Sequence, residues 1–133
     1  MRFEDWPERL AQFIEARRHQ PFVRGTHDCV MFAADAIQAM TGVDLAAEYR
    51  GSYTTTKEAL RFIQGRGGME NIVPLESIPV ALAGRGDIAM IDTPEGDALA
   101  VHLGRTIAAQ GGQGILFLPV SAAKRAWKGD THG

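Results

Sequence analysis

The chain has 133 residues, 45% of them hydrophobic, with 14 Lys and Arg against 16 Asp and Glu. This size predicts one globular domain over residues 1–133, with a loose tail at 129–133. The net charge of −2, with scattered basic residues, gives no general attraction to nucleic acid or an anionic membrane. The single cysteine excludes an internal disulfide framework, and the polar N-terminus is unlike a secretory signal, so we expect a cytoplasmic protein.

The first half of the chain carries helix signals. Residues 5–8 combine an N-cap, a helix-start proline and a reciprocal glutamate, and apolar residues then recur at helical spacing as far as Gln20. A second helix, over 29–40, is apolar around most of its circumference and stops at Gly42. We expect it to be the most buried helix of the protein.

A third helix, over 55–65, begins with a capping box between Thr55 and Glu58. From there glycines become frequent and the apolar segments shorten, which is typical of a strand meander. Strands are expected at 87–91, 98–103, 105–109 and 114–118, with turns at 93–97 and 110–113 and a short edge strand at 126–128. Helices followed by strands indicate an α+β domain, with the buried helix packed on one face of an antiparallel sheet.

The only cysteine, Cys29, directly follows Asp28 at the start of the second helix. The Asp28 carboxylate can cap the unpaired N–H groups of the first turn. The partial positive charge of the helix N-terminus favours a thiolate, so Cys29 is a candidate nucleophile with a pKa below the unperturbed value of about 8.5. The alternative is a cysteine that acts only as a small buried hydrophobe.

Two histidines are candidate bases for this thiol. His102 shares a strand face with Ala98 and Ala100, whose small side chains leave room for the helix start or a ligand. His27 lies two residues before Cys29. Each has a simpler alternative: His102 as a strand-end residue bonded to water or backbone, and His27 as an ordinary loop residue.

Asp35 is six residues after Cys29 and therefore on another face of the helix, where we interpret it as a structural anion. Arg50 can pair with it through two bonds and fix the following loop, Arg50-Gly51-Ser52-Tyr53, although ligand contact by this loop is an alternative. One cysteine and four dispersed histidines lack zinc-ligand spacing, and the glycine clusters lack a nucleotide-binding context. No metal or cofactor is predicted.

The order of these motifs resembles the NlpC/P60 superfamily of papain-like cysteine peptidases. The resemblance is carried by Pro21-Phe22, Gly25 and Asp28-Cys29 at the helix start, Arg85-Gly86-Asp87 before the first strand, and Ala98 to Gly104. It implies a papain-like α+β fold and attack of the thiolate on cell-wall stem peptides, with a histidine as base. Aligned with the family's His-x-Gly-x-x-x-Gly strand, however, the chain has Ala98 at the histidine position and Ala108-Ala109 near the third catalytic residue.

More narrowly, the chain resembles a small phage and prophage family associated with tail assembly, through Ala34-Asp35, Thr41-Gly42, Arg50 to Tyr53 and Ala126-Trp127. This resemblance implies phage tail proteins as partners and incorporation into a tail. Two functions therefore stay open. One is a domain used in assembly, which keeps Cys29 but has an incomplete catalytic set. The other is an active cell-wall peptidase or related thiol hydrolase that uses Cys29 with His102 or His27.

Overall fold

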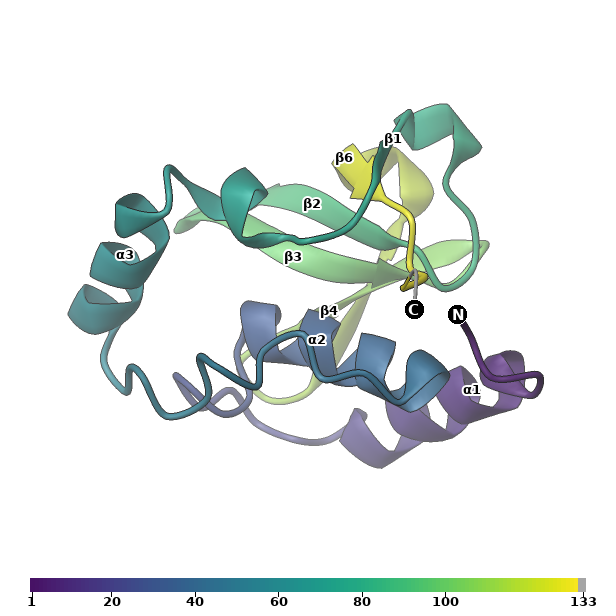
Figure 1. The fold of residues 1–133 in the computed structure, drawn as a ribbon, viewed down its shortest axis with the longest axis horizontal. Helices are drawn as coiled ribbons and strands as arrows, with labels where there is room; N and C mark the ends of the chain where they lie inside the picture. Colours follow the sequence, from purple (N-terminus) through teal and green to yellow (C-terminus); the bar gives the residue numbers. More distant parts are fainter. Residues whose placement is uncertain (132–133) are drawn as a thin grey trace.

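The computed structural model describes residues 1–131, with the helices before the strands (Figure 1). The helices are α1 (Trp6–Arg17), α2 (Cys29–Thr41) and α3 (Thr56–Gly65), followed by the 3-10 helix η1 (Met69–Ile72). The strands and the 3-10 helices among them are β1 (Ser77–Ile78), η2 (Val80–Leu82), β2 (Ile88–Thr93), β3 (Gly96–His102), β4 (Thr106–Gln110), β5 (Ile115–Pro119), η3 (Val120–Ala122) and β6 (Ala123–Trp127). The predicted α+β class is confirmed.

The six strands form one antiparallel sheet in the order β1-β6-β2-β3-β4-β5. The predicted turns at 93–97 and 110–113 connect β2 to β3 and β4 to β5. The prediction of an edge strand near 126–128 is wrong, because β6 lies between β2 and β1. The true edge strand, β1, has only two residues, which is too short to show an alternating pattern.

Helix α2 is the centre of the fold, as predicted. Eight of its residues are buried, against two in α1 and one in α3. It lies between the sheet and α1 (Figure 1), with Phe32 and Ile37 in the same cluster as Leu99 and Val101 of β3. The helix ends at Gly42, whose left-handed backbone (φ +81°) is the conformation that glycine adopts without strain.

The other two helices differ in how they start. In α3 the predicted capping box is present, with Thr55 and Glu58 bonded to each other's backbone N–H groups. In α1 the predicted cap is absent, because Asp5 has a non-extended backbone and its carboxylate accepts a hydrogen bond from Arg9 Nε at 2.7 Å. Helix α1 also ends at Arg17, three residues before the expected end.

A network of charged side chains ties α1, α2 and the loop after α2 together. Asp35 accepts bonds from Arg50 Nη2 at 2.5 Å, which confirms the predicted pair, and from Arg17 Nη1 at 2.7 Å. Arg50 also binds Asp44 at 2.8 Å. Through Arg50, the loop is thereby fixed to the middle of α2.

The last described residues are held by the N-terminal segment. The Gly129 N–H donates to Asp87 Oδ1 at 2.9 Å, and Arg2 Nε donates to the Gly129 carbonyl at 2.9 Å. The prediction of a loose tail is therefore wrong for 129–131, while His132 and Gly133 lie outside the described residues. Within residues 1–131, no helix is long and apolar enough to cross a membrane.

Replacing Asp35 by Asn removes the charge that Arg17 and Arg50 share. We expect the free energy of unfolding to fall by about 2 kcal/mol, because the Arg17 side chain is only 11% exposed and would lose its ionic partner. Asp44→Asn is the matched control, with an expected loss below about 1 kcal/mol, because Asp44 pairs only with the more exposed Arg50. Urea denaturation measures both; equal losses would contradict the central role of Asp35.

Candidate functional site

The start of α2 is fixed by the fully buried carboxylate of Asp28. Its Oδ1 accepts the Met31 N–H and its Oδ2 the Gly25 N–H, both at 2.9 Å, and the Tyr53 hydroxyl also donates to it. Gly25 has φ +89° and would place a Cβ 2.2 Å from the Tyr53 carbonyl oxygen. The segment before α2 and the loop after it thus meet at Asp28, and Cys29 is the first helical residue, as predicted.

The Cys29 residue keeps some contact with solvent, but protein atoms surround its thiol. Burial raises the pKa of this thiol to about 11, and the negative charge of Asp28 adds to the effect. A hydrogen bond from the Leu99 backbone N–H and the positive charge of Arg24 oppose it. The expectation of a pKa below 8.5 is therefore wrong, because desolvation and the capping carboxylate outweigh the helix N-terminus.

Cys29 lies in the wall of a cleft of about 920 Å³. The walls come from the segment before α2, the start of α2, α3, and the two turns 93–97 and 110–113. The lining residues are Phe22, Arg24, Cys29, Val30, Tyr53, Thr56, Ala59, Leu60, Ile63, Gln64, Met69, Thr93, Pro94, Glu95, Gly96, Asp97, Ala98, Gln110 and Gly112. None of these described residues is a histidine.

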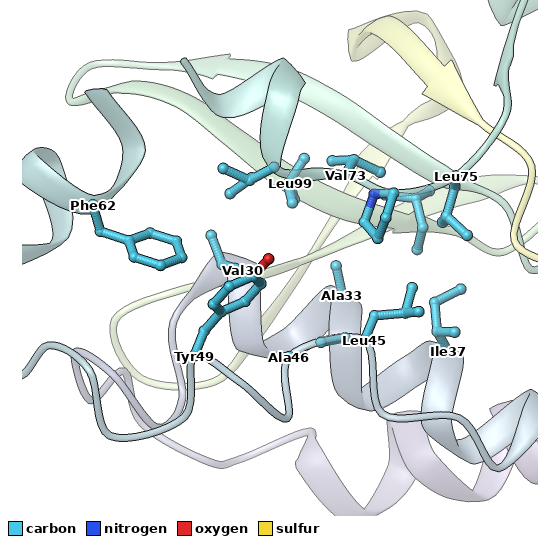
Figure 2. A pocket seen from close by; sticks show the side chains of 14 residues that line it. Val30, Ala33, Ile37, Leu45, Ala46, Tyr49, Phe62, Val73, Leu75 and Leu99 are labelled. Atoms are coloured by element: carbon cyan, nitrogen blue, oxygen red, sulfur yellow. The ribbon is translucent and has the colours of Figure 1, made fainter. Parts of the chain in front are cut away.

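A second, much smaller cavity of about 40 Å³ lies between α2 and the chain segments 45–49 and 72–75. Figure 2 shows its apolar lining, with Phe62 and Tyr49 at one end and Ile37 and Leu75 at the other. The cavity offers no nucleophile, base or charged group. It is a gap in apolar packing.

His102 is held away from the thiol. It lies three residues beyond Leu99 on β3, which is about 10 Å along the strand. It also pairs with Ile107, whose side chain is in the apolar cluster on the sheet face opposite to α2. Burial lowers the pKa of His102, and its Nδ1 accepts the Gly104 N–H at 3.0 Å. The expected room for the helix start beside Ala100 is therefore absent, because the helix packs on the other face.

His27 is close to Cys29 in sequence but does not line the cleft. Burial lowers the pKa of His27 and the positive charge of Arg17 adds to this, while Asp35 and Asp28 oppose it. The ring is therefore close enough to Arg17, Asp35 and Asp28 to sense their charges. Its buried Nδ1 has no hydrogen-bond partner among the described residues. In this geometry neither candidate histidine contacts the thiol.

The other candidate residues divide between two places. Tyr53 lines the cleft and contacts Asp28, whereas Asp35 and Arg50 form the charge network outside the cleft. Ala98, which the sequence alignment places at the position of the family's histidine, lines the cleft, but its methyl group packs in the apolar cluster on the sheet face opposite to α2.

Sequence patterns did not predict two polar residues of the cleft, Arg24 and Gln110, as site residues. Neither belongs to a motif or a periodic pattern, so no sequence signal marks them.

Of the two alanines near the third catalytic position, Ala108 faces the α2 side of the sheet and Ala109 the opposite side.

A solved structure has the same fold. The crystal structure of the NlpC/p60 domain of the peptidoglycan hydrolase SagA aligns with a TM-score of 0.59 and 18% identity, covering 92% of this chain and 97% of that one. At this identity the match shows the fold alone, and it confirms the expected NlpC/P60 architecture.

No curated protein sequence matches the chain. A family model described as "Domain of unknown function (DUF6950)" matches residues 1–129, nearly the whole chain. The protein therefore belongs to the DUF6950 family and has an NlpC/P60 fold.

Proposed function

We propose that this protein is a peptide-binding domain of NlpC/P60 type that has lost hydrolytic competence and serves in the assembly of a phage or prophage tail. The observation that carries this proposal is the setting of Cys29. Its thiol has a pKa of about 11, and the cleft residue at the family's histidine position is Ala98.

Thiol hydrolysis needs a thiolate and a group that exchanges its proton. With a pKa of about 11, only about one Cys29 in ten thousand is ionised at pH 7. An imidazole within hydrogen-bond reach would relieve this by taking the proton. The polar residues that do line the cleft near Cys29, such as Tyr53 and Arg24, are not bases at neutral pH.

The role in tail assembly rests on the sequence resemblance to a tail-associated family. The cleft gives such a role a physical basis, because an open groove on a folded domain can bind a segment of a tail protein. On this proposal the protein is made in the cytoplasm of the bacterial host and then joins the tail. Mass spectrometry of purified particles from a prophage that encodes the protein tests this; its absence from both particles and assembly intermediates would contradict it.

A second candidate function is an active cell-wall peptidase. The retained Cys29 at a helix start and the fold shared with the SagA domain favour it. In that case Cys29 would have to act with His102 or His27 after a rearrangement of β3 or of the segment before α2.

The first test is alkylation of Cys29 by iodoacetamide. At pH 7 we expect a rate about two orders of magnitude below that of a model thiol, because the raised pKa leaves little thiolate. The rate should keep rising with pH beyond 9, where the rate of the model thiol levels off. A rate plateau below pH 8.5 would contradict the proposal, and Cys29→Ala provides the background rate.

The substitution Ala98→His tests whether the family's histidine position can reach the thiol in this fold. We expect the alkylation rate at pH 7 to stay close to the wild-type rate, because the side chain at 98 belongs to the apolar cluster on the sheet face opposite to α2. Ala98→Gln is the control, with a polar side chain of comparable size that is not a base. A clearly higher rate in Ala98→His than in Ala98→Gln would show that position 98 does face the thiol.

Cleavage of peptidoglycan stem peptides decides between the two functions. We expect the wild-type protein to show no turnover above that of Cys29→Ala at equal concentration, because none of the described residues that line the cleft beside the thiol is a histidine. Turnover abolished by both Cys29→Ala and His102→Ala would establish a Cys29–His102 pair and overturn the proposal. Turnover that survives His102→Ala but not His27→Ala would identify His27 as the base.

A further inference from the structure

We propose that the cleft recognises a carboxylate on its peptide ligand and that Arg24 is the residue that binds it. The inference rests on the proposed function only in treating the cleft as a peptide-binding site. It adds the chemical class of the ligand and the residue that selects it.

Arg24 is placed in the cleft wall close to Cys29. It lies one residue before Gly25, whose N–H is bonded to the buried Asp28, so its backbone is anchored to the start of α2. Its guanidinium stacks over the Phe22 ring, with the guanidinium carbon 4.6 Å from the ring centroid. The positive charge is close enough to Cys29 and Tyr53 to lower the pKa of both groups in part.

The guanidinium of Arg24 has no ionic partner within the described part of the chain. Two other arginines have mostly buried side chains, and each binds a carboxylate: Arg2 binds Asp87 at 3.3 Å, and Arg17 binds Asp35 at 2.7 Å. In Arg24 the buried Nε makes no hydrogen bond, and no ion pair joins the group to any described residue. Because a partly buried guanidinium gains most from a planar anion, this group is available to a carboxylate from outside the chain.

Gln110 adds a second polar group without a full set of hydrogen-bond partners to the same cleft. Its Nε2 donates to the carbonyls of Gln20 at 2.8 Å and Gly111 at 2.9 Å, which fixes the orientation of the amide. The Oε1 atom is left as a buried acceptor without a partner among the described residues. An unpaired cation and an unpaired acceptor together suit a peptide that carries both N–H groups and a carboxylate.

The acidic residues of the cleft restrict where the anion binds. Glu95 and Asp97 come from the turn between β2 and β3, and Asp97 is paired with Lys124 at 2.5 Å. These carboxylates disfavour an anion at that wall. Arg24 is the only cationic side chain among the described lining residues, so the ligand carboxylate is directed to the Phe22–Arg24 side of the cleft.

Three peptides measure this preference by calorimetric or NMR titration. N-acetyl-Ala-Glu-Ala amide carries a side-chain carboxylate, N-acetyl-Ala-Gln-Ala with a free C-terminus carries a terminal one, and N-acetyl-Ala-Gln-Ala amide is the neutral isostere. We expect at least one charged peptide to bind wild-type protein at least about tenfold more tightly than the neutral peptide. The peptide that does so identifies the source of the carboxylate.

Arg24→Gln should abolish the preference while leaving the affinity for the neutral peptide within about twofold. Arg105→Gln is the matched control, because it removes the same charge from an exposed position outside the cleft and should keep the preference. Equal binding of all three peptides, no binding of any, or a preference that survives Arg24→Gln would overturn the inference. These outcomes are separate from those of the cleavage assay, since turnover contradicts the loss of hydrolysis without affecting the charge preference.

Discussion

The buried carboxylate of Asp28 is the group on which the geometry of the cleft depends. A charge with no exposed surface is tolerable only when several donors satisfy it, and here they come from Gly25, Met31 and Tyr53. These residues belong to the segment before α2, to α2 itself and to the loop after it. Removing the carboxylate would therefore release two walls of the cleft from the helix that carries Cys29.

The same carboxylate helps to explain why Cys29 is a weak acid. The N-terminus of α2 offers partial positive charge, but the capping Asp28 accepts the Met31 N–H of the first turn and adds a full negative charge beside the thiol. An imidazolium would offset that charge. Arg24 supplies only part of this compensation, and the thiol stays protonated at neutral pH. The Asp28 carboxylate, which positions Cys29 by capping α2, thus opposes ionisation of the thiol unless a base is present.

Sequence patterns predicted the features that depend on neighbouring residues. The capping box of α3, the Asp28 cap and the burial of α2 each follow from spacing within one segment. The Arg50–Asp35 pair was also predicted, because a planar guanidinium can satisfy a semi-buried carboxylate.

The features that the sequence did not predict depend on packing between distant segments. Alternation placed His102 on one face of β3 but did not indicate which face α2 covers. The two-residue strand β1, and with it the inner position of β6, is set by contacts across 50 residues. Similarly, the helix N-terminus predicted a lowered pKa for Cys29, whereas the opposite sign follows from burial by β3 and the cleft walls. Local electrostatics can be read from sequence, but desolvation requires the fold.

These features fit recognition better than reaction. In a thiol hydrolase, the polar groups next to the nucleophile must move a proton, and their pKa values must lie near the working pH. In the cleft with Cys29, the guanidinium of Arg24 is a hydrogen-bond donor only, and the amide of Gln110 is a neutral donor and acceptor. Groups of this kind discriminate between ligands by charge and hydrogen-bond pattern. On our proposal, the cleft uses these groups to select a peptide and no longer cuts it, because burial keeps the neighbouring thiol neutral.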